Sequence, residues 1–506
     1  MHIDLDNFTN NTILSADFCI VGTGPSGMSV LSKLIQSNKK IILLESGDLN
    51  QKYRHETLNE GYSTGPRELD LINSRSRMFG GFGSLWAGKC GIFAKEDFKK
   101  NFFSSLSGWP ISYDDINPYY KEACDLLNIN YQDFSLKRKF ETDDIFYKLL
   151  SNKNSLLEGQ DFPHANDNDK DISNKFRKIL IESKKIDLIT NATIIDLIQN
   201  TDNDNINSLK VLSINNKNLL VKAKFFILSL GAIENARFIL NSSLKEKFKQ
   251  NNYLGNCFMS HPGFGPTSSI VESVNMCNTQ ELKDFTFGIN LNATERKKLN
   301  ILNANINITP LHKQKIKKIE NLQNIFDRIV NNSRYINATN QIKCLFKNNN
   351  IENKYWHTGI GLEQEPWTSN KLSLSNQYCK FGKKKVNIYW DKISHLEKKT
   401  VINSTMAVGR QLKLTNRSLQ ELNSDLMSGK IFDQQDPINH HIGTTRMANN
   451  HNEGVVDKNL KFFGINNLYL SGSSVFPTSG NVGPTFTIIA LSLRLGDHLT
   501  RKILST

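Results

Sequence analysis

The sequence predicts an α/β domain joined to a second, α+β domain built on an antiparallel sheet, and three observations support this. An apolar run, Phe18 to Val21, enters a glycine-rich turn, and an amphipathic helix and a second apolar strand follow. A further strand–glycine–helix element recurs far along the chain, from Phe225 to Leu240. Short runs of alternating apolar residues between positions 372 and 390 are typical of antiparallel strands.

The first of these elements has the glycine spacing of a nucleotide-binding turn. Gly22 makes the tight turn, Gly24 lets the backbone approach a pyrophosphate, and Gly27 lets the helix pack closely on the strand. The helix that begins around Ser26 offers free N–H groups and the positive end of its dipole to phosphates. The unit is therefore Rossmann-like.

The second strand of this unit, Ile41 to Leu44, ends on an acidic residue. Glu45 follows the glycines by roughly 20 residues, where a carboxylate hydrogen-bonds ribose hydroxyls, and Ser46 stands beside it. Together these features predict a bound dinucleotide. The position of the unit near the N-terminus favours FAD, although the spacing alone fits NAD as well.

Length and composition limit the classes of protein. A chain of 506 residues with 38% hydrophobic residues is long enough for two or three domains with substantial cores. The net charge of +14 comes from a general richness in lysine, and basic clusters with interleaved aromatic residues are absent. We therefore expect no nucleic acid as partner; the basic residues indicate a solvated face or, as an alternative, an anionic substrate or surface.

Cysteine usage and apolar runs bear on the compartment. No apolar run reaches the ~18 residues of a membrane span, and the N-terminus has no basic and apolar secretory pattern. The seven cysteines are scattered and never in CxxC spacing, which predicts no disulfide framework and no metal site. We expect a cytoplasmic protein.

The chain leaves the nucleotide-binding domain and returns to it. Strands are expected at 186–189, 194–198 and 225–230, the last leading into Gly231 as another edge of the nucleotide fold. In the Lys/Asn-rich middle, residues at helical spacing indicate the buried face of a surface helix: Leu322, Ile325, Phe326, Ile329 and Val330. The expected division is residues 1–262 and 437–506 for the nucleotide-binding domain and 263–436 for a substrate domain, with the site at the seam.

A second glycine-dense loop runs from Arg77 to Gly88. Its amides, around Gly80, Gly81 and Ser84, could wrap a pyrophosphate or an isoalloxazine ring. A tight structural turn explains the same residues equally well.

Several further segments form an ordered set of motifs: Arg77 to Gly88, Ser107 to Tyr113 with Pro118 to Tyr120, His440 to Met447, Leu468 to Thr478, Gly483 to Thr487, Leu254 to Pro262, and Glu363 to Pro366 with Lys371 to Leu374. Together they resemble one enzyme family, the glucose-methanol-choline (GMC) flavoprotein oxidoreductases. The segment from Ser107 to Tyr120 and the segment from His440 to Met447 are most similar to the sugar-oxidising branch, which includes pyranose oxidases and sugar dehydrogenases.

This resemblance implies FAD-dependent oxidation of a hydroxyl of a sugar, glycoside or cyclitol to a carbonyl. The carbinol hydride would go to flavin N5 and the hydroxyl proton to His440, which matches the family's catalytic histidine; an imidazole titrates near neutral pH. The neighbouring His441 is assigned no role. Residues expected near the flavin from the family pattern are Gly472, Ser473, Pro484 and Thr485.

The chain departs from the family pattern at two positions. Gly483 stands where the family has an Asn or His as second partner of the substrate oxygen, so Asn481 reaches in, or water fills the gap, or the second role is lost. Leu85 stands where covalently flavinylated relatives have a histidine, which predicts non-covalent FAD.

Other functions stay open at this point. A non-redox relative such as a hydroxynitrile lyase, or a catalytically silent flavin-binding scaffold, would keep the same motifs. A steroid substrate is a further alternative, which the polar middle domain does not favour. The partner is a small molecule, expected to be carbohydrate-like, with oxygen or another compound as electron acceptor.

Overall fold

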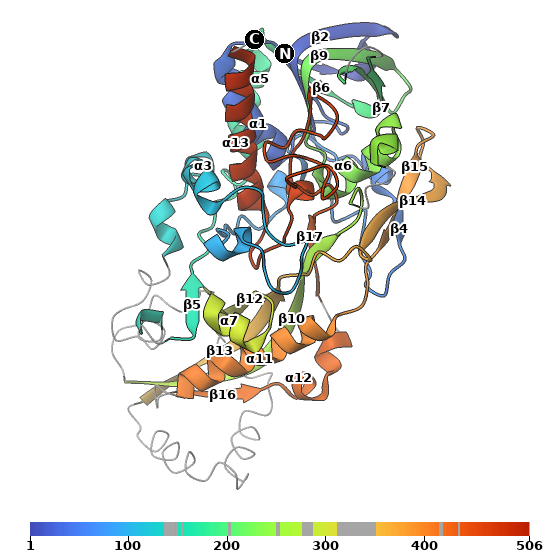
Figure 1. The fold of residues 1–506 in the computed structure, drawn as a ribbon. Coiled ribbons are helices and arrows are strands. Elements are labelled where there is room, and N and C mark those ends of the chain that lie inside the picture. Colours follow the sequence, from blue (N-terminus) through green and yellow to red (C-terminus); the bar gives the residue numbers. More distant parts are fainter. Residues whose placement is uncertain are drawn as a thin grey trace.

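A computed structural model gives the fold of the chain (Figure 1). The part that it describes comprises residues 1–135, 147, 150–152, 155–200, 204–248, 253–275, 287–310, 351–413, 418–433 and 436–504. The expected helix with Leu322, Ile325 and Phe326 lies outside the described residues.

The larger sheet has eight strands in the order β1-β6-β3-β2-β9-β8-β7, with β18 also paired to β9. In this order, the neighbours β1-β6-β3-β2-β9 pair in parallel, and so do β9 and β18. Strand β8 pairs antiparallel with both β7 and β9. Their bounds are β1 His2–Asp4, β2 Thr12–Val21, β3 Ile41–Leu44, β6 Ile186–Thr190, β7 Thr193–Gln199, β8 Ile206–Leu212, β9 Asn218–Leu228 and β18 Leu468–Leu470.

The strands expected from the sequence lie in this sheet, with one difference in position. In the parallel register, Val21 is paired with Leu44 on one side and with Leu228 on the other. The strand before Gly231 is thus not an edge strand. It lies inside the sheet because a short antiparallel meander, β7 and β8, continues beyond it.

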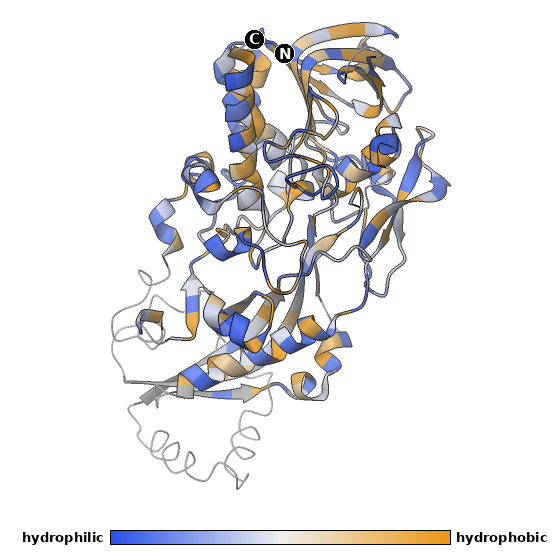
Figure 2. Cartoon of the chain, viewed as in Figure 1, coloured by the Kyte–Doolittle hydropathy of each residue, from blue (hydrophilic) through white to orange (hydrophobic). Residues whose placement is uncertain are grey.

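Helices cover the larger sheet. Helix α1 begins at Pro25, directly after the glycine-rich turn, and it packs beside the C-terminal helix α13, whose one face is apolar (Figure 2). The helix bounds here are α1 Pro25–Leu34, α2 Tyr53–Glu56, α3 Tyr113–Leu127, α5 Ile172–Glu182, α6 Gly231–Leu240 and α13 Thr485–Leu504. Short 3-10 helices are η1 Leu5–Asn7, η2 Ile35–Ser37, η3 Thr57–Asn59, η4 Gly81–Ser84, η5 Lys95–Phe98, η6 Tyr131–Phe134, η8 Ser243–Phe248, η10 Lys430–Asp433 and η11 Ser473–Val475.

The second sheet is antiparallel, as expected, with the order β16-β10-β13-β12-β11-β5 and β17 also paired to β10. Helix α11 packs on it in the lower half of Figure 1. The bounds are β5 Leu157–Gln160, β10 Met259–Asn275, β11 Phe287–Leu291, β12 Ala304–Pro310, β13 Ile351–Leu362, β16 Ser418–Leu422, β17 Asp436–Ile442, α7 Ala293–Leu299, α11 His395–Lys413 and α12 Ser424–Ser428.

The alternating runs near 372–390 form strands that pair with each other outside this second sheet. Leu372 is opposite Ile388 in a small sheet of β14 Lys371–Tyr378, β15 Lys384–Tyr389 and β4 Gly61–Ser63. One apolar core lies under the large sheet and a separate one under the antiparallel sheet. Because β10 runs through positions 262 and 263, the expected domain division stays a prediction.

Candidate active site

A cavity of about 640 Å³ lies at the carboxyl ends of β2, β3 and β9. Ligands of open α/β sheets bind at this edge, and the volume is within the roughly 300–1,000 Å³ of ligand pockets. The cavity lining includes most of the residues that the sequence singled out: Gly22, Gly24, Ser26, Glu45, Ser46, Gly81, Gly231, His440, Gly472, Ser473, Asn481, Pro484 and Thr485. Gly27, Gly80 and Ser84 lie outside the lining.

The glycine wall of the cavity is defined here by Gly22, Gly24, Gly231 and Gly472. Gly22 has φ +96°, and a Cβ atom there would lie 2.5 Å from the carbonyl oxygen of Ser229. A Cβ on Gly231 would meet no atom within 4 Å and would project into open space, with φ at +79°. Backbone therefore forms this wall, and the missing side chains leave room for a ligand.

Gly27 has the packing role that its spacing predicts. A Cβ atom at this position would lie 1.9 Å from the carbonyl oxygen of Gly22, so any side chain would force α1 away from β2. Gly80 is also a packing residue, since a Cβ there would lie 2.7 Å from Ser173 Oγ. Ser84 Oγ is buried and has no hydrogen-bond partner among the described residues.

Glu45 is held against the glycine-rich turn. Its Oε2 accepts hydrogen bonds from the hydroxyl of Thr23 at 2.7 Å and from the Thr23 N–H at 3.2 Å. Oε1 accepts from the N–H of Gly47 at 2.9 Å. Burial raises the pKa of this carboxyl. The carboxylate lines the cavity at the strand end where a ribose is expected.

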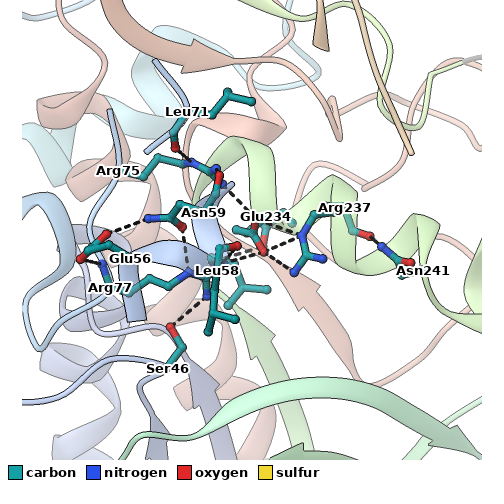
Figure 3. Close-up of polar contacts among 12 residues, drawn as sticks. Ser46, Glu56, Leu58, Asn59, Leu71, Arg75, Arg77, Glu234, Arg237 and Asn241 are labelled. Carbon is teal, nitrogen blue, oxygen red and sulfur yellow. Dashed lines mark hydrogen bonds and ion pairs between the residues drawn. The ribbon is translucent and has the colours of Figure 1, made fainter. Parts of the chain in front are cut away.

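A charged cluster stands behind Ser46 (Figure 3). The carboxylate of Glu234 lies 2.9 Å from Arg75 Nη1, 3.1 Å from Arg77 Nη2 and 2.8 Å from Arg237 Nη2. Burial alone would raise the pKa of Glu234, but the three guanidinium groups hold it well below its usual value. Because Arg77 Nη1 also donates to Ser46 Oγ at 3.1 Å, the cluster ties the end of β3 to helix α6.

The histidine wall of the cavity is defined here by His261, His440 and Gly483. Strands β10 and β17 pair with each other, and they carry His261 and His440 respectively. The Nδ1 atoms of the two imidazoles lie 2.9 Å apart. His261 Nε2 lies 3.0 Å from the carbonyl oxygen of Ser479 and 2.9 Å from that of Gly480.

These contacts fix the protons on both rings. Carbonyl oxygens only accept, so His261 Nε2 carries a hydrogen, and in the neutral ring its Nδ1 is an acceptor. His440 Nδ1 must then donate to it, which leaves the lone pair of His440 on Nε2. Burial lowers the pKa of His261 to about 4, and burial together with the neighbouring His261 lowers the pKa of His440 well below its usual value. Both rings are neutral near pH 7.

Gly483 faces the free nitrogen. A Cβ atom there would lie 3.6 Å from His440 Cε1 and 3.8 Å from Nε2, so a side chain at this position would stand beside Nε2. The glycine leaves that space open. Asn481 is buried and lines the same cavity two residues away.

His441 is separated from its neighbour by the alternation of the strand. Its ring lies beside Phe258, with centroids 6.0 Å apart, and Nε2 has no partner among the described residues. Burial, with a smaller contribution from Arg75, lowers the pKa of His441 to about 3. Among the described residues its ring shares no hydrogen bond with His261 or His440, although its charge would also contribute to the lowered pKa of His440.

Sequence reasoning missed many residues of the cavity, among them His261, Arg77 and Lys89. His261 and Arg77 belong to segments that carried the resemblance, and a second histidine before Pro262 was a signal. Lys89 had no signal, because it stands alone after a glycine-dense loop. Among the described residues no group of three or more His, Cys, Asp or Glu could hold a metal, and no helix there is long and apolar enough to cross a membrane.

Comparisons with known proteins relate the chain to one family and to several enzymes. Residues 398–492 match the family described as GMC oxidoreductase. The chain is 21% identical to the fructose dehydrogenase large subunit of Gluconobacter japonicus over 98% of its length and 99% of the relative's. Over 12% of the chain, and 11% of the relative, it is 40% identical to the 2-methyl-1,2-propanediol dehydrogenase of Mycolicibacterium austroafricanum.

Solved structures share the fold. A formate oxidase of Aspergillus oryzae, in a structure concerned with FAD modification, has a TM-score of 0.57 at 14% identity, with 98% of this chain and 100% of that chain covered. The pyridoxine 4-oxidase structure of Mesorbium loti has a TM-score of 0.59 at 13% identity, with 96% and 99% covered. The family model thus matches this one segment of the chain, and the solved structures show the shared fold.

Proposed function

We propose that the protein is an FAD-dependent oxidoreductase that oxidises a hydroxyl of a sugar, glycoside or cyclitol to a carbonyl, with His440 as the base. The observation that carries this proposal is the neutral histidine pair beside a cavity with a glycine wall. His440 presents an unshared nitrogen lone pair to the cavity, and proton acceptance at such an atom is what alcohol oxidation requires.

The residues of the glycine wall fit FAD. Gly22 and Gly24 leave the backbone bare for a pyrophosphate, and α1 directs its N-terminus there. Glu45 and Ser46 stand at the strand end for the ribose, and Gly231, Gly472 and Ser473 continue the lining. Ser26, Gly81, Pro484 and Thr485 complete the proposed contacts, whereas Gly27, Gly80 and Ser84 would act through the packing of the turn and the loop. Bound FAD would supply a two-electron hydride acceptor.

We propose that FAD binds non-covalently, because Leu85 stands where covalently flavinylated relatives have a histidine. This residue lines the cavity with half of its side chain exposed, and a leucine has no nucleophilic atom. Denaturation should therefore release the flavin into the supernatant.

The chain's part in the reaction is the movement of one proton. The substrate hydroxyl donates to His440 Nε2, and the proton moves to that nitrogen as the carbinol C–H bond breaks. The imidazolium so formed keeps its hydrogen on Nδ1 and continues to donate to His261 Nδ1. His261 in turn is oriented by the carbonyl groups of Ser479 and Gly480, so the base needs no rearrangement during proton transfer.

Asn481 is our candidate for the second polar partner of the substrate oxygen. Gly483 itself offers only its backbone N–H, and its missing side chain leaves the space beside Nε2 into which a neighbouring amide can reach. The lining supports this because both Asn481 and Gly483 belong to it.

A carbohydrate-like substrate is supported by the polar lining and by one relative. Asn305, Asn307 and Asn439 join Asn481 in the cavity, and amides suit the hydroxyl groups of a polyol. The relative aligned over the whole chain is named a fructose dehydrogenase. We also propose that the domains divide at residues 262 and 436. We further propose a cytoplasmic location, which is supported by the free thiols of Cys19, Cys90, Cys124, Cys257 and Cys379.

The test is a visible spectrum of the purified protein, followed by a panel of sugars, glycosides and cyclitols added without oxygen. We expect oxidised-flavin bands that bleach with at least one compound. A colourless protein that cannot be reconstituted with FAD would contradict the cofactor. Flavin bands that bleach with no member of a broad alcohol panel would contradict the oxidation and favour a lyase or a silent scaffold.

A further inference from the structure

Among the described residues that line the cavity, Lys89 is the one that brings an ammonium group. Lys89 Nζ lies 3.3 Å from Asn307 Oδ1 and 4.5 Å from the centroid of the Phe162 ring. Among the residues that the structure describes, Lys89 has no ion-pair partner. Burial lowers its pKa, which the more distant carboxylate of Asp161 partly offsets. An amine in this position is poorly solvated and makes no direct ion pair with any residue that the structure describes.

Packing connects Lys89 to the reacting group. The Phe162 ring beneath the ammonium lies 3.2 Å from a Cβ built on Gly91, and that Cβ would lie 2.7 Å from Cβ of Val482. Val482 adjoins Gly483, which faces His440. The ammonium and the base therefore lie on one continuous surface of the cavity.

Asn307 adds further donors beside the ammonium. Its Oδ1 accepts both from Lys89 and from Asn305 Nδ2, the latter at 3.0 Å, which leaves the two Nδ2 hydrogens of Asn307 without a partner among the described residues. In the lining that the structure describes, the carboxylates are Glu45, bonded to Thr23, and Glu234, bonded to three arginines. These two carboxylates are thus already paired, whereas Lys89 and Asn307 present a cation and spare hydrogen-bond donors to the cavity.

We propose that the substrate is an alcohol that carries an anionic group, a carboxylate or a phosphate, held by Lys89 and Asn307 while its hydroxyl faces His440. This inference rests on the proposed function and names the class of its substrate. A neutral polyol would leave the ammonium desolvated and unpaired, which is costly, whereas an anion satisfies its charge and its free hydrogens. Lysine is a point charge that can bind either anion. The amides of Asn305, Asn439 and Asn481 remain for hydroxyl groups.

The first test measures binding and needs no turnover. Acetate, oxalate and inorganic phosphate are titrated into the flavin-loaded protein, and the change in flavin absorbance gives each affinity. We expect saturable binding of a carboxylate or of phosphate, weakened about 10-fold or more in Lys89→Gln and Lys89→Met by the loss of a charge-assisted hydrogen bond. Which anion binds separates the two sources of negative charge.

Lys95 provides the matched control. It lies over an aromatic ring as well, with Nζ 5.3 Å from the Tyr113 centroid, but it is exposed and lies outside the cavity lining. Lys95→Gln should leave anion binding unchanged. Equal affinities in wild type and Lys89→Gln, or a change of the flavin spectrum in Lys89→Gln with anion affinity unchanged, would overturn the proposal.

The second test uses matched substrates in anaerobic flavin bleaching. Gluconate and glucose 6-phosphate are each compared with glucose. Other neutral sugars are compared in the same way with the corresponding sugar acids and sugar phosphates. We expect an anionic member to bleach the flavin with a higher kcat/KM, and the advantage to disappear in Lys89→Gln through a higher KM. Bleaching by neutral alcohols alone would overturn this inference but leave the proposed function standing. Bleaching by no alcohol would contradict the proposed function, and the anion titration would still decide the site.

Discussion

The glycine wall comes from short local motifs, whereas the histidine wall is assembled from strands that are far apart in the sequence. Gly22 and Gly24 belong to one turn whose spacing alone predicts its use. His261 and His440 are 179 positions apart and meet because β10 and β17 pair. The comparison teaches that a binding surface made of backbone is readable from spacing, while a reacting pair of side chains depends on long-range topology.

The largest expected effect follows from removing the proposed base, which should change the histidine wall and leave the glycine wall intact. His440→Ala should slow flavin reduction by about 10²–10⁴-fold, the usual contribution of a general base, while FAD content stays at the wild-type level. The measurement is single-turnover bleaching in a stopped-flow instrument. His441→Ala is the matched control, because its ring also lines the cavity but shares no hydrogen bond with the pair among the described residues. Equal losses in both variants would contradict the assignment.

Removing the positioning residue should have the next largest effect. In His261→Ala the Nδ1 hydrogen of His440 loses its acceptor, so the base can rotate or change tautomer, and we expect a loss of about 10²-fold in the reduction rate. In His261→Asn, Oδ1 can replace Nδ1 as acceptor and should restore part of that loss. A purely structural role would instead predict that both variants lose thermal stability and activity together.

The glycine wall can be tested with two glycines of equal strain. Gly231 and Gly382 both have positive φ, +79° and +68°, and a Cβ on either would meet no atom within 4 Å. Replacement by alanine should cost each about 1–2 kcal/mol of stability from the left-handed backbone. Only Gly231 lines the cavity, so only Gly231→Ala should also lower FAD affinity. FAD titration of the apoproteins checks this, and equal affinities would contradict the wall's role.

The last expected effect concerns stability rather than activity and is a pH dependence outside both walls. Glu363 is buried with Oε1 unpartnered among the described residues, and burial together with Asp97 raises its pKa to about 8. Folded protein keeps this proton up to about pH 8, whereas the unfolded chain releases it above a pKa of about 4.3, so Glu363 lowers stability as pH rises through that window.

Glu363→Gln removes this dependence because an amide resembles the protonated carboxyl. Relative to wild type, the variant should gain stability steadily between pH 5 and pH 8. Urea denaturation at pH 5, 6.5 and 8 measures the difference. If the difference in the free energy of unfolding between the variant and wild type is the same at all three pH values, Glu363 is ionised in the folded protein.

The sequence alone allowed much of the fold and part of the site to be predicted. The order of strand, turn, helix and strand around Gly22 follows from local periodicity. The alternation near 372–390 predicted antiparallel strands, but those strands form the small sheet of β14 and β15, and the larger antiparallel sheet comes from other segments. His440 was found through its motif. His261 and Lys89 were not predicted, because their proposed roles depend on their surroundings in the fold. Two carbonyl oxygens orient His261. Lys89 bonds to an asparagine and has no direct ion-pair partner among the described residues. No local sequence pattern predicts the surroundings of either residue.

The most direct measurement is the ratio of carbonyl formed to flavin reduced in an anaerobic single turnover with the alcohol that bleaches the flavin. The account predicts one carbonyl product for each flavin that loses its oxidised bands, with both events slowed together in His440→Ala. Carbonyl formation without any loss of the flavin bands, as a lyase would give, would contradict it.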